Sequence, residues 1–169
     1  ATFSNEGDNW DPFPSPNGKY IIFSTNRSSS STRWLGLPCV SQIGHDSTWQ
    51  NPEMLKLPIT EGDAIYHPTI SDNNNMYFGG SLNEFSNLAT SDIYYCNILE
   101  DSIVITSAGP DINTEYEETH PFIAPDESYI LFSSNRPGGS GKLDIYVSFA
   151  FKDGWSKPHN LGPKINSYD

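Results

Sequence analysis

Hydrophobic and polar residues alternate along short segments of this chain. In the last third, residues 129–135 form a β-prone segment, and residues 143–151 carry apolar side chains at every second position. A period of two residues is typical of a β-strand with one buried face. Turn-forming sequences, Pro-Asp-Glu-Ser at 125–128 and Pro-Gly-Gly-Ser-Gly at 137–141, separate these segments,. The pattern predicts short antiparallel strands joined by tight turns.

Four strands of this kind make one unit. A short first strand is expected at residues 122–123, and a fourth, outer strand is expected to begin at Trp155 and end near Leu161,. The chain is also poor in Leu and Ala and rich in Tyr, Phe, Ile, Thr and Ser, a composition that favours strands over helices,.

The unit occurs three times. Pro12, Pro68 and Pro121 stand at corresponding positions, 56 and 53 residues apart. Within one region of residues 1–169, the units are predicted to span about 3–58, 59–111 and 112–164, with 165–169 starting a further unit. Repeated units of four short antiparallel strands are typical of the blades of a β-propeller. The sequence therefore predicts an all-β fold of three four-stranded antiparallel blades.

Three blades do not close a ring, because propellers have about four to eight blades. An open set would leave the flanks of the first and last blades as apolar surfaces in water. We therefore expect the chain to be part of a larger propeller or to complete one by associating with copies of itself. Because it begins at Ala1 without a signal-peptide pattern, we also expect a mature or excised segment,.

Composition narrows the range of partners. The formal net charge of −12 argues against nucleic acid, which requires Lys and Arg to neutralise phosphates,. No apolar run approaches the roughly 18 residues that cross a bilayer, so no membrane span is expected. The acidic, aromatic-rich chain suits a periplasmic or secreted protein. Cys39 and Cys96 fall at non-corresponding points of two units, which favours small buried hydrophobic residues over a disulfide,.

Asp11, His67 and His120 correspond to one another directly before the innermost strand of each unit. In a propeller this position lies near the mouth of the central channel, so three blades would aim these side chains toward one axis. Asp and His are ligands for divalent metals such as zinc or manganese, the one cofactor that this set suggests. The alternative is that each side chain bonds the backbone of a neighbouring blade and no cofactor is involved.

Aromatic residues add to this candidate ligand-binding site. Trp10 and Tyr66 directly precede Asp11 and His67, and their rings either stack on sugars or pack the blade edges. Trp34 lies in an insertion of the first unit and has no counterpart, so it is a further candidate for contacting a partner.

Several sequence strings resemble a known repeat. They are Phe-Ser-Ser-Asn-Arg-Pro-Gly-Gly at 132–139, Asp-Ile-Tyr at 144–146, Gly-Trp-Ser-x-Pro at 154–158 and Asn-Leu-Gly-Pro-x-Ile-Asn at 160–166. Together they resemble the WD40-like, TolB-type β-propeller repeat of bacterial envelope proteins. The resemblance is strongest over residues 119–167 and extends more weakly over nearly the whole chain.

The resemblance implies a propeller of typically six or more blades, often periplasmic and often attached to a peptidoglycan-associated or protease domain. Some propeller-fold polysaccharide lyases with a similar repeat hold a metal with histidines from several blades. Arg136 and Asp144, on neighbouring strands of the third unit, are expected to form an ion pair that closes the glycine-rich loop,.

Two functions follow as expectations. The chain lacks a Gly-x-Ser-x-Gly nucleophile elbow, and we expect a non-catalytic scaffold that binds a protein or glycan partner in the cell envelope or outside the cell,. The alternative is part of a metal-dependent polysaccharide lyase or hydrolase that uses Asp11, His67 and His120. Whether the protein is an enzyme stays open, with the missing catalytic constellation favouring the scaffold.

Overall fold

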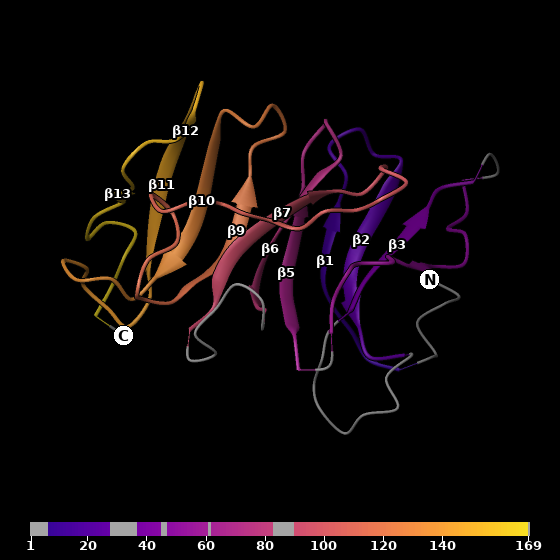
Figure 1. Cartoon of the computed structure of the whole chain (residues 1–169), viewed down its shortest axis with the longest axis horizontal. Coiled ribbons are helices and arrows are strands. Elements are labelled where there is room, and N and C mark those ends of the chain that lie inside the picture. Colours follow the sequence, from indigo (N-terminus) through magenta and orange to yellow (C-terminus); the bar gives the residue numbers. More distant parts are fainter. Residues whose placement is uncertain (1–6, 28–36, 45–46, 61, 83–89, 169) are drawn as a thin grey trace.

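The computed structural model describes residues 7–27, 37–44, 47–60, 62–82 and 90–168. These residues form β-strands without any helix, arranged in three antiparallel sheets that stand in a row along the long axis (Figure 1). The all-β class predicted from the alternating pattern is confirmed. No helix in this part of the chain has the length and apolar character needed to cross a bilayer.

Each sheet is a meander of strands that are consecutive in sequence. The first contains β1 (Asn9–Pro14), β2 (Tyr20–Thr25), β3 (Leu37–Gln42) and β4 (Glu53–Met54). The second contains β5 (Ala64–Ile70), β6 (Asn75–Ser81), β7 (Asp92–Asn97) and β8 (Thr106–Ser107). The third contains β9 (Glu118–Ile123), β10 (Tyr129–Ser134) and β11 (Asp144–Phe151), with β12 (Gly154–Trp155) and β13 (His159–Asn160) both paired to β11.

The third sheet therefore differs from the prediction at its outer edge, where two short strands replace one. A tight turn at Lys152 and Asp153, followed by Gly154 with φ of 141°, folds β12 onto the end of β11 before β13 pairs farther along. The first sheet has the same feature in reduced form, an isolated bridge between Ile43 and Trp49. The outer strand is thus interrupted in two of the three units.

The hydrophobic core lies between the sheets. Alternate residues of β6 point to opposite sides: Met76 and Phe78 enter the core shared with the first sheet, and Tyr77 enters the core shared with the third. Burying a side chain of this size contributes about 1.5–3 kcal/mol. Because the second sheet is covered on both faces, packing between sheets is the main source of apolar burial in this row.

The segments that follow the second and third sheets share one geometry. Asn113 accepts a hydrogen bond from Ile93 N and donates one to Ile93 O, at 2.9 and 2.8 Å. Asn166 makes the same two bonds with Ile145, at 2.8 and 3.1 Å. The residue before each Asn differs in burial, since Ile112 is fully buried and Ile165 is 60% exposed.

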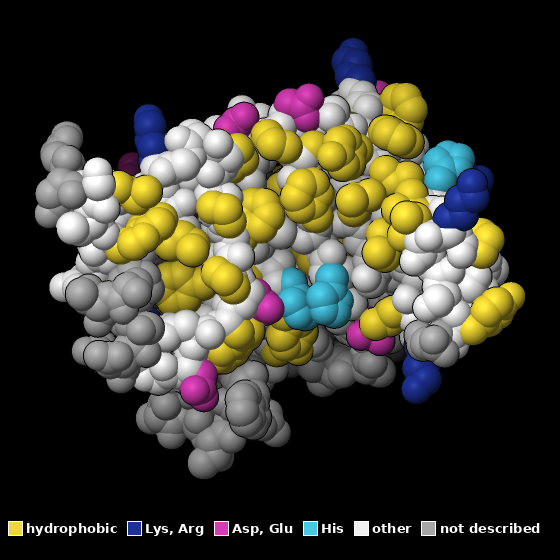
Figure 2. Space-filling view, turned by 180° about the vertical axis from the view of Figure 1, so that it is seen from behind, with side chains coloured by type: hydrophobic (Ala, Val, Ile, Leu, Met, Phe, Trp, Pro, Cys, Tyr) yellow, Lys and Arg dark blue, Asp and Glu magenta, His cyan; other side chains and the backbone are white. Residues whose placement is uncertain are grey.

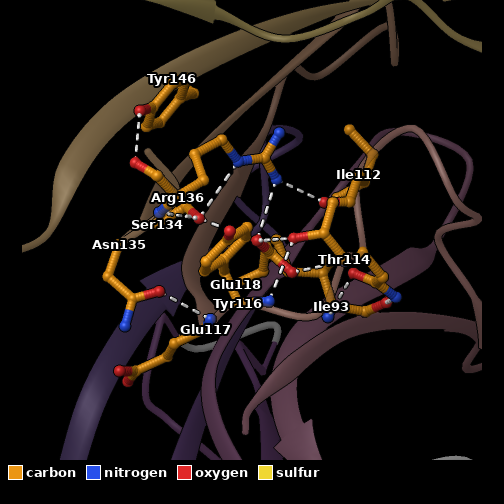
Figure 3. Close-up of polar contacts among 11 residues, drawn as sticks. Ile93, Ile112, Thr114, Tyr116, Glu117, Glu118, Ser134, Asn135, Arg136 and Tyr146 are labelled. Carbon is orange, nitrogen blue, oxygen red and sulfur yellow. Dashed lines mark hydrogen bonds and ion pairs between the residues drawn. The ribbon is translucent and has the colours of Figure 1, made fainter. Parts of the chain in front are cut away.

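A buried polar cluster anchors β9 (Figure 3). The fully buried Glu118 carboxylate accepts hydrogen bonds from Arg136, Ser134 and both the N–H and the hydroxyl of Thr114, at 2.8–3.0 Å. Arg136 also donates to Ile112 O at 2.6 Å. The cluster therefore joins β9, β10 and the segment that precedes β9.

The ion pair expected between Arg136 and Asp144 is wrong. Arg136 pairs with Glu118 at 3.0 Å, while Asp144 accepts hydrogen bonds from the backbone N–H groups of Ser140 and Gly141 and from Asn160. The glycine-rich loop is thus closed by backbone donors, and the guanidinium is free to satisfy the buried carboxylate instead.

Cys39 and Cys96 are both buried and free, as the favoured interpretation of their spacing predicted.

Candidate binding site on the first strands

Asp11, His67 and His120 occupy the same backbone feature in β1, β5 and β9. Each lies at a β-bulge, where the register with the next strand shifts, and each has a left-handed backbone with φ of 51–52°. Non-glycine residues rarely adopt this conformation, which costs on the order of 1–3 kcal/mol. A bulge redirects the side chain at its centre. The repeat has therefore kept a strained position in all three units.

The three side chains meet. Asp11 Oδ2 lies 3.7 Å from His67 Nε2 and accepts a hydrogen bond from His67 N at 3.3 Å. The rings of His67 and His120 stack with centroids 3.7 Å apart and planes at 24°. Figure 2 shows two adjacent histidine side chains near the middle of this face, beneath a band of hydrophobic side chains. One residue from each sheet contributes to the site.

Asp11 also behaves as the structural alternative predicted, because it bonds the backbone of the neighbouring sheet. The histidines are different. His67 Nδ1 is buried and lacks a hydrogen-bond partner among the described residues. Burial lowers the pKa of His67, the neighbouring His120 lowers it further, and Asp11 opposes both. These effects favour the neutral imidazole.

This arrangement does not fit a divalent ion. A metal binds an imidazole nitrogen in the plane of the ring, and two stacked rings direct their nitrogens along nearly parallel lines rather than toward one point. Within the described residues, no group of three His, Cys, Asp or Glu side chains is arranged to hold a metal ion.

Two hollows flank the histidine pair. The larger, of about 480 Å³, is lined by polar and aromatic residues that include Tyr66, His67, Ser91, Glu117, Thr119 and His120. The smaller, of about 160 Å³, lies between the three bulge residues and the prolines that follow them. Burial raises the pKa of Tyr66, and the nearby Glu117 carboxylate, which also lines the larger pocket, raises it further.

Two tryptophans, Trp10 and Trp34, are the remaining candidates from the sequence. Trp10 is partly exposed on β1 but is not among the residues that line either hollow. Trp34 lies outside the described residues. Sequence reasoning missed Glu117 and Ser91 as lining residues. The acidic run before His120 was a signal for Glu117, whereas no repeated pattern marks Ser91.

Comparisons with known proteins bear on the fold alone. No protein-family model matches the sequence, and no curated protein matches it. Among solved structures, the chain is similar to one from a study of two prolyl endopeptidases and the role of inter-domain dynamics in catalysis and specificity. The TM-score is 0.54 with 11% identity over 88% of this chain. The chain corresponds to only 19% of the length of that protein.

That prolyl endopeptidase contains a β-propeller domain, and the likeness agrees with antiparallel sheets arranged as propeller-like blades. The finer assignment to a TolB-type repeat stays a prediction. At this identity the similarity shows the fold and carries no activity to this chain.

Proposed function

We propose that this chain is part of a β-propeller that serves as a non-catalytic scaffold, binding a protein or glycan partner in the cell envelope or outside the cell. The observation that carries the proposal is the convergence of Asp11, His67 and His120, in strained conformations, beside a polar pocket. Strain repeated at one surface site points to recognition, because folding alone favours its removal. The TolB-type resemblance supports the periplasmic or secreted setting.

A binding role fits this pocket better than a catalytic one. Nucleophilic catalysis needs a hydroxyl or thiol within hydrogen-bond reach of a base. None of the hydrogen bonds among the described lining residues joins Ser91 or Thr119 to a histidine. Imidazole and phenol rings beside a carboxylate instead offer flat surfaces and hydrogen-bond acceptors, which suit a sugar ring or a peptide.

The third sheet supports the idea that a larger propeller is formed. Leu131 and Ile145 occupy the positions that Tyr77 and Ile93 hold in the second sheet. Tyr77 and Ile93 are buried by the third sheet, whereas Leu131 and Ile145 are only partly buried.

Further apolar residues extend this uncovered face. Phe149 and Phe151 are 47% and 68% exposed, and Ile165 is exposed where its counterpart Ile112 is fully buried. A contiguous apolar face of this kind marks a surface that another element covers. A further blade of the same repeat would cover it as the third sheet covers the second.

Sedimentation of the isolated chain tests this packing. We expect concentration-dependent self-association, since a second copy is then the only source of a covering surface, and we expect Phe149→Lys with Phe151→Lys to abolish it. A wild-type chain that stays monomeric at about 100 μM would contradict the proposal.

The binding role itself is tested on a glycan array and, for protein partners, by photo-crosslinking from position 117, which also lines the pocket. We expect His120→Ala and Tyr66→Ala each to lower the affinity for the partner about tenfold, a loss of about 1.4 kcal/mol in binding free energy. His159→Ala, which removes an exposed histidine of β13, is the matched control and should bind as wild type. Partners retained equally by all variants would reject this pocket as the site.

A further inference from the structure

A second pocket lies between the second and third sheets, at the other end of their strands. It is bordered by the start of β6 at Asn75, whereas the larger hollow beside His67 and His120, the histidine-pair pocket, borders the end of that strand at Ser81. Its volume of about 710 Å³ falls in the range of small-ligand sites,. The two pockets share no lining residue. The elements around it, β6, β7, β11 and β12, are labelled in Figure 1.

Aromatic side chains form one wall of this pocket. Tyr77 and Tyr95 stack with ring centroids 5.2 Å apart and planes at 19°. Trp155 of the third sheet meets Tyr77 edge-on at 6.3 Å. Tyr77 is nearly buried, and Tyr95 and Trp155 are half-buried with surface left to the pocket. Both sheets thus contribute to an aromatic surface that their packing holds rigid.

A fixed carboxylate stands beside this wall. Glu127 Oε1 accepts hydrogen bonds from Ser71, Asn73 and Asn75, at 2.6, 3.2 and 2.9 Å. Among the described residues, none of the hydrogen bonds reaches the other oxygen, Oε2. The carboxylate is therefore oriented before any ligand arrives, which reduces the entropy that binding would otherwise lose.

Glu127 also holds an unusual backbone. Its φ is 60°, at a turn where the first sheet has a glycine, Gly18, with φ of 68°. A left-handed glutamate is strained where a glycine is not. The Glu127 side chain explains part of this strain, because its Oε1 atom holds the turn of the second sheet by hydrogen bonds. Its Oε2 atom remains available to a ligand in the pocket.

The rim carries a negative charge. Asp111, Glu127 and Asp153 line the pocket, and Lys152 is the one basic residue among the described lining residues. This balance disfavours phosphates and uronic acids, which are anionic. It does not disfavour a neutral ligand whose hydroxyl groups donate hydrogen bonds to carboxylates.

We propose that this groove is a second binding site, for a short neutral oligosaccharide. The apolar face of a pyranose ring stacks on the aromatic wall, and its hydroxyls donate to Glu127 Oε2 and the rim carboxylates. The proposal is independent of the histidine-pair pocket, because it uses different residues at the other end of the strands.

The test is an NMR titration that follows the side-chain signals of Tyr77, Tyr95 and Trp155. The probes are cellotriose, maltotriose, mannotriose and chitotriose, with trigalacturonate as the anionic probe and tetramethylammonium as a cation for the aromatic wall. We expect saturable shifts with at least one neutral trisaccharide and none with trigalacturonate. The signals report on the wild-type chain, so the result does not depend on a variant that folds poorly.

Variants then locate the contacts. Glu127→Gln keeps an acceptor for the hydrogen bonds to the turn of the second sheet but replaces one carboxylate oxygen with a donor. It should lower the affinity for the trisaccharide about tenfold. His120→Ala should leave this binding unchanged, which separates it from binding at the histidine-pair pocket. Shifts with tetramethylammonium alone, an absence of shifts with every neutral probe, or wild-type affinity of Glu127→Gln would each overturn the proposal.

Discussion

The second and third sheets fill one corresponding position with opposite chemistry. Their registers place Ile65 and Glu118 at matching positions, and Leu82 and Arg136 correspond to one another just after the neighbouring strands β6 and β10. In the second sheet both residues belong to the apolar core. In the third they form a hydrogen-bonded ion pair whose carboxylate is fully buried. One backbone therefore accepts an apolar pair or a charged pair at the same place.

The first sheet has an intermediate solution. Arg27 occupies the arginine position and donates to the neutral Asn9 side chain at 2.7 Å, while its guanidinium lies 5.6 Å from the Phe23 ring. Arg136 similarly lies 5.1 Å from the rings of Phe132 and Tyr146. The aromatic contact is common to both arginines, whereas the position that Glu118 holds in the third sheet is occupied by the neutral Asn9 in the first.

A further difference is that Glu118 of the third sheet makes two kinds of contact that separate residues account for in the second sheet. Before β5, Asp63 accepts hydrogen bonds from the N–H and hydroxyl of Thr60, at 2.6 and 2.9 Å. Before β9, Glu118 does the same for Thr114 and in addition pairs with Arg136. In the second sheet the polar Asp63 bonds the preceding threonine, and the apolar Ile65 occupies the position of Glu118. The third sheet should therefore be more sensitive to a single substitution.

The largest effect is expected from Arg136→Leu. The substitution leaves Glu118 buried without its cation, and breaking a buried pair in this way costs about 3–5 kcal/mol. Because the Arg136 side chain is 14% exposed, we expect a value near the lower end of that range. Urea unfolding followed by tryptophan fluorescence measures the change.

Arg27→Leu is the matched control, because Asn9 carries no charge. It should cost less than Arg136→Leu, on the order of 1 kcal/mol for each hydrogen bond lost, because Asn9 is not left as an unpaired buried charge,. Equal losses for Arg27→Leu and Arg136→Leu would show that the buried charge does not set the difference between the sheets.

Converting the third sheet to the chemistry of the second should recover much of this loss. In Arg136→Leu with Glu118→Ile, neither charge of the pair remains, so the double variant should be about 2 kcal/mol more stable than Arg136→Leu alone. Recovery is incomplete because Thr114 loses its carboxylate partner. A double-mutant cycle gives the coupling energy between residues 118 and 136. Stability losses of the two single variants that simply add in the double variant would contradict this prediction.

A substitution in the second sheet tests why the sheet with the apolar pair needs a glycine at position 80. An added Cβ at Gly80 would lie 2.9 Å from Ala64 O, a backbone atom that cannot move aside easily. Gly80→Ala should therefore cost about 1 kcal/mol. Ser81→Ala, at the next and less buried residue, should change thermal unfolding little, and a neutral Gly80→Ala would show that the strands can separate at this point.

The repeat predicted the all-β fold because a period of two residues and regular turns depend on local sequence. It also marked Asp11, His67 and His120 as equivalent, and the structure brings these side chains together. The pairing of Arg136 was mispredicted, because Asp144 is nearer along the chain, whereas the fully buried Glu118 carboxylate is the one that pairs with the arginine. Competition between partners depends on burial, which a sequence pattern does not report.

The same contrast between sheets extends to the histidines, where the smallest effect is expected. His67 of the second sheet is half-buried beside Asp11 and Tyr66 and lines one pocket with Glu117, while His120 of the third sheet is exposed.

Burial and the neighbouring His120 lower the pKa of His67 in the folded chain, so below about pH 6.5 the unfolded chain binds a proton there more readily than the folded chain does,. Stability should therefore be highest above this pH and fall as the pH drops toward the lowered pKa. His67→Gln should reduce this fall, and His120→Gln should reduce it less, because burial is the larger cause. Urea unfolding at pH 5.5, 6.5 and 7.5 compares the variants, since carboxylates titrate alike in all of them. A wild-type pH dependence in His67→Gln would place the sensitivity elsewhere in the chain.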